Sequence, residues 1–300
     1  MTTDLFKNTH RSELPLTRDY VFHAVFGRDD DDSRAALMEI LNIILERKDD
    51  PITSIVIKNP IDTAERPGGK ETIMDIRAET GQGELLDIEM QAGSLTVYPN
   101  RVIFYGGRMV NSSLQESEEY DKMKKSIVVS IINGKLFPTL PSCHNVFEVR
   151  EGETGLLLSD RLSIHFLELE KVDITKPVSE MTSIEKLAVY LKYASDEAKK
   201  DVVQEILAEE EIIMAENAYR KLTQDEIEYE RLESEYRSRL FINTEISIAR
   251  KEGREEGLQA GEEKLNKLNL LLIEESRIDD LQKAAKDEAY RQQLYLEFGL

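Results

Sequence analysis

Two neighbouring segments alternate between apolar and polar residues, and this pattern constrains the fold more than any other feature of the sequence. Residues 71–79 (ETIMDIRAE) and 84–92 (ELLDIEMQA) alternate with period two, and residues 80–83 (TGQG) separate them. Alternation of this kind on both sides of a glycine-containing turn predicts a β-hairpin with one face on the core and one polar face.

A turn centred on Gln82 fixes the register of this hairpin. Antiparallel pairing then places Asp75 opposite Glu89 and Arg77 opposite Asp87, with directly opposed Cβ atoms about 4.5–5.5 Å apart. The apolar side chains of both segments point to the opposite, core face; they are Met74, Ile76, Leu86, Ile88 and Met90.

The polar face carries the candidate chemistry, and Gln91 shares it because it follows Glu89 by two residues. Asp75 and Glu89 at this distance repel each other unless a cation lies between them. Carboxylate oxygens suit Mg²⁺ or Mn²⁺, and such an ion polarises a phosphoryl oxygen. The alternation by itself is not specific, since an ordinary half-exposed hairpin with a solvated polar face and an Arg77–Asp87 ion pair has the same pattern.

The residues around the hairpin predict a mixed α/β sandwich followed by helices. Ser33 is the expected N-cap of the first helix. From Pro177 onward the sequence is rich in Glu, Lys, Ala and Leu, which is typical of helices. The expected elements are a helix over 33–46, a strand over 52–59, a helix over 99–114, strands over 126–134, 144–151 and 162–170, and helices over 181–194 and 197–256.

Composition limits the partners and the compartment. The net charge of -20 argues against a nucleic-acid binder, which normally shows a basic footprint, although a bulk charge does not describe a local groove. The single cysteine, Cys143, excludes an internal disulfide and favours a reducing cytoplasm. The chain has no run of about 18 apolar residues, so we expect no membrane span. The first residues contain no apolar segment typical of a signal peptide.

The hairpin also resembles a known family. Residues 75–91 (DIRAETGQGELLDIEMQ) are similar to the D…(D/E)xQ signature of the Rpn-type PD-(D/E)XK nucleases, which are often labelled as transposases. The resemblance covers nearly the whole chain. It includes the entry segment 16–27, the helix and strand at 101–114 and 126–137, the later strand at 162–171, and the closing segment 278–300.

The resemblance implies a restriction-endonuclease-like αβββαβ core with a C-terminal helical extension. It also implies Mg²⁺ or Mn²⁺ as cofactor, DNA as partner, and a link to recombination or mobile elements. Asp75 and Glu89 would be the metal ligands, together with the backbone carbonyl of Met90. Gln91 stands where the broader class has a lysine; a neutral amide can orient a water molecule but supplies no charge.

The helix over 99–114 presents four polar residues on one face: Arg101, Tyr105, Arg108 and Ser112. Arg101 is expected to replace the missing cation or to bind phosphate, with Tyr105 beside it and Arg108 in contact with DNA. The alternatives are surface arginines paired with nearby acids and a tyrosine in the core. Lys70 either contacts the DNA backbone or is a solvated loop residue.

Two acidic residues outside the hairpin have open roles. Asp19 either caps a helix or joins the acidic site, and the cap is the favoured interpretation. Glu39, on the first helix, is expected to be solvated.

The sequence therefore predicts a nuclease-like core over 1–175, a helical extension over 176–250, and a charged linker helix with a small helical tail over 251–300. The predicted function is a metal-dependent DNA endonuclease in the cytoplasm. One alternative is a catalytically inactive relative that acts as a DNA-binding or protein-interaction module. Another is a helical assembly protein, in which residues 197–260 drive homodimerisation.

Overall fold

A computed structural model describes most of the chain, namely residues 14–58, 61–62, 72–73, 75–92, 95, 97–114 and 117–300. For residues 61–62, 72–73, 237–253 and 255–260 it describes the backbone alone. By contacts the chain divides into two compact units, Met1–Ser238 and Arg239–Leu300.

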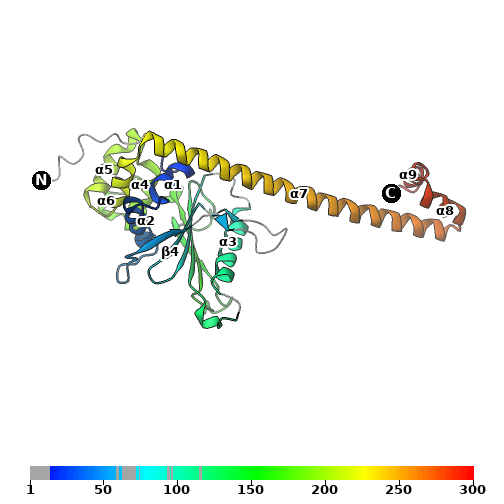
Figure 1. The fold of residues 1–300 in the computed structure, drawn as a ribbon, viewed down its shortest axis with the longest axis horizontal. Helices are drawn as coiled ribbons and strands as arrows, with labels where there is room; N and C mark the ends of the chain where they lie inside the picture. The colour runs from blue at the N-terminus through cyan, green and yellow to red at the C-terminus, as the bar shows by residue number, and fades with distance from the viewer. Residues whose placement is uncertain are drawn as a thin grey trace. The chain divides into compact units, whose positions relative to one another are not determined.

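A six-stranded sheet forms the centre of the first unit, in the order β1-β4-β5-β6-β8-β7 (Figure 1). The strands are β1 (Ile55–Lys58), β4 (Ile76–Thr80), β5 (Leu85–Gln91), β6 (Ser126–Ile132), β7 (His144–Glu148) and β8 (Leu162–Glu168), and a separate short ladder joins β2 (Ile61–Asp62) to β3 (Thr72–Ile73). Strands β1, β4 and β5 are antiparallel, β5, β6 and β8 are parallel, and β7 is antiparallel to β8. This order confirms the predicted αβββαβ core.

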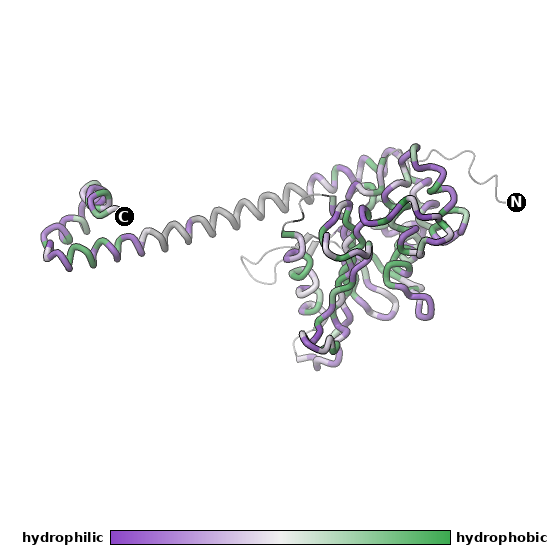
Figure 2. The backbone as a smooth tube through the Cα atoms, turned by 180° about the vertical axis from the view of Figure 1, so that it is seen from behind, coloured by the Kyte–Doolittle hydropathy of each residue, from purple (hydrophilic) through white to green (hydrophobic). Residues whose placement is uncertain are grey.

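Helices cover both faces of the sheet. On one face, the sheet shares a hydrophobic cluster with α1 (Asp19–Phe26), α2 (Asp31–Ile44), α4 (Ser183–Tyr193), α5 (Lys200–Ala208) and α6 (Ile213–Lys221). The other face packs on α3 (Tyr98–Ser112). Short 3₁₀ turns occur at Tyr120–Lys122, Leu169–Lys171, Val178–Glu180 and Glu197–Lys199. Figure 2 shows the hydrophobic stretches gathered along the strands and the helices that pack on them.

Helix α3 lies close to the sheet because the chain has a glycine at the contact. A parallel pair such as β5 and β6 needs a crossover connection, and α3 provides it. A Cβ atom on Gly106 would lie 2.9 Å from Leu162 Cδ1, whereas one on Gly107 would meet nothing within 4 Å. Gly106 therefore allows close packing of the helix, and Gly107 faces away from the sheet.

The first predicted helix begins two residues earlier than expected. Its N-cap is Asp30, whose side chain accepts a hydrogen bond from the Ser33 backbone N–H at 2.9 Å. The prediction of Ser33 as the cap was wrong, because Ser33 lies inside the first turn and is fully buried.

The C-terminal half is helical, as predicted. Helix α7 runs over Gln224–Glu274 and is followed by α8 (Ile278–Lys286) and α9 (Glu288–Glu297). In the second unit, Leu268 and Leu272 of α7 form a small apolar cluster with Ala284, Leu294 and Tyr295. None of the described helices is both long and apolar enough to cross a membrane.

The predicted boundaries at residues 175 and 250 remain predictions. The packing places Leu187, Val203 and Tyr219 of the helical extension in the same hydrophobic cluster as Leu86 and Ile88 of β5.

We therefore expect α4 and the sheet to unfold together. Replacing the fully buried Leu187 by alanine should lower the free energy of unfolding by about 2–5 kcal/mol, and Leu86→Ala should shift the same transition in urea followed by circular dichroism. The control Leu232→Ala alters a side chain that is 53% exposed and should have little effect. Two separate transitions, with Leu187→Ala moving only one, would contradict a shared core.

Candidate metal centre and active site

The register of the β4–β5 hairpin decides which side chains meet. Arg77 pairs with Asp87, as predicted. The same register places Asp75, just before β4, across from Glu89 on β5. Since side chains two residues apart share a face of a strand, Asp87, Glu89 and Gln91 all lie on the side covered by α3.

Asp75 and Glu89 are joined by hydrogen bonds through the backbone at this point. The Asp75 N–H donates to Glu89 Oε1 at 3.2 Å, and the Met90 N–H donates to Asp75 Oδ2 at 2.9 Å. The two carboxylates therefore converge on one edge of the hairpin and do not lie on opposite sides of the sheet.

Most of this acidic face is buried. Glu89 is 1% exposed and Asp87 is fully buried, whereas Asp75 is half-buried. Neither carboxylate oxygen of Asp87 has a hydrogen-bond partner among the described residues. The alternative interpretation, a solvated polar face, is therefore wrong for β5, because α3 covers these side chains.

Burial raises the pKa values of all three carboxyl groups, and repulsion from a neighbouring carboxylate adds to the shifts of Glu89 and Asp87. Burial, followed by the charge of Asp75, raises the pKa of Glu89 to about 8. Burial raises the pKa of Asp75, and burial with the charge of Glu89 raises the pKa of Asp87 well above its usual range. Arg101 opposes these shifts without cancelling them, so the pKa of Glu89 stays high despite its ion pair.

Arg101 brings a positive charge into the site from the first turns of α3. Its Nη2 donates to Glu89 Oε2 at 2.7 Å and to Gln91 Oε1 at 3.1 Å. The guanidinium lies over the rings of Tyr98, at 4.7 Å, and Tyr105, at 5.6 Å. The negative charge of Glu89 raises the pKa of Arg101 even though burial opposes its charge, so Arg101 is a fixed cation of the site.

The other residues of the predicted helix face differ in their surroundings. Tyr105 is 3% exposed and belongs to the apolar cluster under α3. Arg108 is half-buried, and the Ser112 hydroxyl donates to the Met109 carbonyl of its own turn. Lys70 lies outside the described residues, as does the predicted core residue Met74, so the interpretation of Lys70 remains a prediction.

Tyr98 belongs to the site although the sequence did not single it out. It is 2% exposed, its hydroxyl donates to Ser130 Oγ at 3.1 Å, and its ring lies under Arg101. The signal in the sequence was the spacing of Tyr98, Arg101 and Tyr105 at i, i+3 and i+7, which places two aromatic rings beside one arginine.

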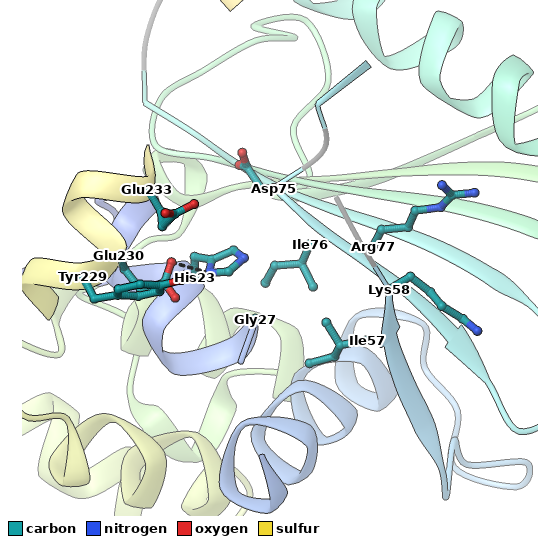
Figure 3. A pocket seen from close by; sticks show the side chains of 10 residues that line it. All are labelled: His23, Gly27, Ile57, Lys58, Asp75, Ile76, Arg77, Tyr229, Glu230 and Glu233. Atoms are coloured by element: carbon teal, nitrogen blue, oxygen red, sulfur yellow. Dashed lines mark ion pairs between the residues drawn. The ribbon is translucent and has the colours of Figure 1, made fainter. Parts of the chain in front are cut away.

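Residues at the beginning of α7 line a cavity next to Asp75. No pattern in the sequence predicted this contact. His23 Nδ1 lies 2.8 Å from Glu230 Oε2, and together with Asp75, Ile76 and Tyr229 these residues line a cavity of about 200 Å³. In Figure 3 His23 and Glu230 point toward each other, while the carboxylate of Asp75 points away from His23. This cavity is therefore a neighbour of the acidic face and not its continuation.

The two acidic residues with open roles both contact distant helices. The Ser234 hydroxyl, 215 residues away in sequence, donates to Asp19, and the charge of Asp19 contributes to the raised pKa of Asp75. The favoured interpretation of Asp19 as a helix cap was wrong, since α1 has no side-chain cap. Glu39 is half-buried and not simply solvated, because it also accepts the N–H groups of Met214 and Ala215 at the start of α6.

The oxygen ligands of this site suit a hard divalent cation. The described side chains alone are too few to complete its coordination shell. Asp75 and Glu89 offer carboxylate oxygens, and the two buried oxygens of Asp87 on the same face have no hydrogen-bond partner among the described residues. In the described part of the chain, no three His, Cys, Asp or Glu side chains stand ready to hold a metal ion. An ion bound by Asp75 and Glu89 would complete its shell with backbone, water or phosphate oxygens, as is usual for Mg²⁺.

Comparison with known proteins identifies the family of the chain. A family model described as PD-(D/E)XK nuclease family transposase matches residues 16–248, which confirms the resemblance inferred from the sequence. No curated protein and no solved structure gives a significant match.

The raised pKa values predict that stability falls as pH rises in the absence of divalent metal. The folded state holds a proton on Glu89 up to about pH 8, whereas the unfolded state releases it near its ordinary value of 4.5. Stability from this group is therefore complete below about pH 4.5 and is lost as pH rises through about 8. Glu89→Gln should flatten this slope, measured by urea unfolding in EDTA between those limits.

Glu79→Gln is the matched control for this slope. Its hydrogen bond from Lys124 lowers the pKa of Glu79 below the usual value, so this carboxylate stays ionised over the same window and its replacement should leave the slope unchanged. Equal slopes for the wild-type chain and Glu89→Gln would show that Glu89 is not protonated in the folded state.

Proposed function

The chain belongs to the PD-(D/E)XK nuclease family transposases, and from that premise we propose that it is a divalent-metal-dependent endonuclease that hydrolyses phosphodiester bonds of DNA. Membership of the family indicates a nuclease- or transposase-related role. Metal dependence, endonucleolytic cleavage and the identity of the ion, Mg²⁺ or Mn²⁺, are parts of the proposal.

One observation carries the proposal: the carboxylates of Asp75 and Glu89 converge at the start of β4. Each accepts a backbone N–H from the other strand, at 3.2 Å for Glu89 Oε1 and 2.9 Å for Asp75 Oδ2. Burial raises the pKa values of both groups, and the charge of Asp75 adds to the shift of Glu89; a cation bound between them would offset the cost of ionising both. Perturbed carboxylates of this kind are typical of functional sites.

Each residue of the site has a proposed role. Asp75 and Glu89, with the Met90 carbonyl, would hold the cation, which when bound polarises a phosphoryl oxygen and favours a hydroxide nucleophile. Gln91 is proposed to orient the attacking water through its amide. Arg101 is proposed to stabilise negative charge on the phosphate, and the ring of Tyr105 supports its guanidinium.

Contact with DNA would have to be local, since the chain has 59 acidic and 39 basic residues. Long-range repulsion from this excess weakens encounter with a polyanion. We propose Arg101, Arg108 and Lys70 as the phosphate contacts; Arg101 lies beside the acidic face, and Arg108 follows it two turns further along α3.

A second candidate is a catalytically inactive relative that binds DNA or protein. The observation that favours it is the substitution of the class lysine by Gln91, together with the ion pair between Arg101 and Glu89. Such a protein would bind Mn²⁺ and DNA without cutting the strand.

Several finer expectations accompany the proposal. We propose a link to recombination or mobile elements on the strength of the family, and the cytoplasmic location expected from the lone cysteine remains a prediction. Homodimerisation through the C-terminal helices is also a proposal, and sedimentation of the full-length chain at several concentrations tests it.

Cleavage of supercoiled DNA tests the main proposal directly. We expect cleavage with Mg²⁺ or Mn²⁺ and none in EDTA. Asp75→Asn and Glu89→Gln should each reduce the rate by at least about a hundredfold, because even indirect supports of a metal ligand contribute factors of about 10–100.

Glu79→Gln again serves as the control, since this half-buried carboxylate of β4 is paired with Lys124 and lies outside the site. It should cleave like the wild-type chain. Undiminished cleavage by Asp75→Asn would refute the assignment of the site, whereas metal and DNA binding without any cleavage would favour the inactive relative.

A further inference from the structure

Arg101 occupies the position that a cation would use at Glu89. Glu89 Oε1 already accepts the Asp75 N–H, and Glu89 Oε2 accepts Arg101 Nη2 at 2.7 Å. The side chain of Glu89 is 2% exposed, so solvent cannot screen a second positive charge placed against it. A divalent ion bound through Oε2 would lie within a few ångströms of the guanidinium and would be repelled by it, since like charges at this range interact strongly where water is excluded.

The contacts of Arg101 with the protein do not use all of its hydrogen-bond donors. Its Nε is buried and has no hydrogen-bond partner among the described residues. Its side chain remains 29% exposed, so the guanidinium has a path to solvent. A phosphate group matches the fork of guanidinium donors better than the two contacts that Nη2 alone makes to Glu89 and Gln91, which gives Arg101 a competing partner whenever nucleic acid is bound.

We propose that Arg101 is a resident counter-ion that competes with the divalent cation for Glu89 and moves to a DNA phosphate, so that cation and DNA bind cooperatively. The inference rests on the proposed function, because it assumes that both ligands bind at this site. In the free protein Arg101 weakens cation binding. With DNA present the phosphate takes the guanidinium, and Glu89 Oε2 becomes available.

The direct test is Mn²⁺ binding by isothermal titration calorimetry with the full-length chain, which needs no turnover. Arg101→Met removes the charge and keeps an unbranched side chain between the two tyrosine rings. We expect it to bind Mn²⁺ about tenfold more tightly than the wild-type chain, as removal of one adjacent positive charge implies. Arg101→Lys keeps the charge and should bind Mn²⁺ nearly as weakly as the wild-type chain.

The matched control is Lys124→Met. Lys124 Nζ contacts Glu79 Oε1 at 2.7 Å, the same distance as in the Arg101–Glu89 pair, but outside the acidic face. It should leave Mn²⁺ affinity unchanged. Tighter binding by Lys124→Met to the same degree would show a general charge effect and would overturn the inference.

The coupling is measured by repeating the titration with a nuclease-resistant phosphorothioate duplex. For the wild-type chain we expect the duplex to tighten Mn²⁺ binding by about tenfold, and Mn²⁺ to tighten duplex binding by the same factor, as linkage requires. In Arg101→Met the coupling should largely disappear. A coupling that persists unchanged there would mean that DNA merely adds phosphate ligands, and the inference would fail.

These outcomes separate the inference from the proposed function. Equal Mn²⁺ affinities of the wild-type chain and Arg101→Met, in a protein that cleaves DNA, would overturn only the competition. If the wild-type chain shows no coupling, the inference fails whether or not the variants fold. Absence of Mn²⁺ binding by every variant, with and without the duplex, would remove the proposed function and this inference with it.

Discussion

Burial of Glu89 beside Asp75 sets the conditions for everything else at this site. A carboxylate that is 1% exposed cannot remain charged next to a second carboxylate unless a positive group compensates for the lost hydration. Arg101 supplies one positive charge, while the oxygens of Asp87, deeper on the same strand, have no hydrogen-bond partner among the described residues. The site thus holds more acidic groups than its own arginine can neutralise, and the raised pKa values of the three carboxyl groups, which favour their protonated forms when no other cation is bound, express this imbalance.

Two features of the backbone hold the acidic residues and Arg101 together: the register of the β4–β5 hairpin and the close approach of α3 to the sheet. Pairing of Arg77 with Asp87 fixes the hairpin so that Asp87, Glu89 and Gln91 face α3, while Leu86, Ile88 and Met90 enter the main core. A slip by one residue would exchange these sets, which the core would not tolerate. The close approach of α3 at Gly106 then holds Tyr98, Arg101 and Tyr105 against the acidic face. The same helix therefore buries the carboxylates and provides their counter-charge.

Because the whole chain is acidic, binding of DNA would depend on the few positive groups beside the acidic face. With a net charge of -20, the protein gains little from long-range attraction to nucleic acid. Many basic side chains are also paired, such as Arg47 with Glu84 and Lys124 with Glu79. In the proposed function, recognition of a phosphodiester therefore depends on a few cations beside the acidic face and on the metal ion. The start of α7 adds a wall next to Asp75 through the His23–Glu230 pair, so the helical part supports the site as well as the core.

The sequence by itself determined the hairpin, its register and the meeting of Asp75 with Glu89, because alternation with period two and a short turn are local properties. Its resemblance to the nuclease family, carried by the hairpin motif and by segments along nearly the whole chain, also implied the αβββαβ order. The sequence did not determine that α3 buries Asp87 and Glu89, since an alternating strand looks the same whether its polar face meets water or a helix. Nor did it reveal the contacts of Asp19 with Ser234, of His23 with Glu230, or of Glu39 with the start of α6. Only the tertiary structure decided those, because partners separated by most of the chain leave no periodic signal in the sequence and meet only when the helices pack on a common core.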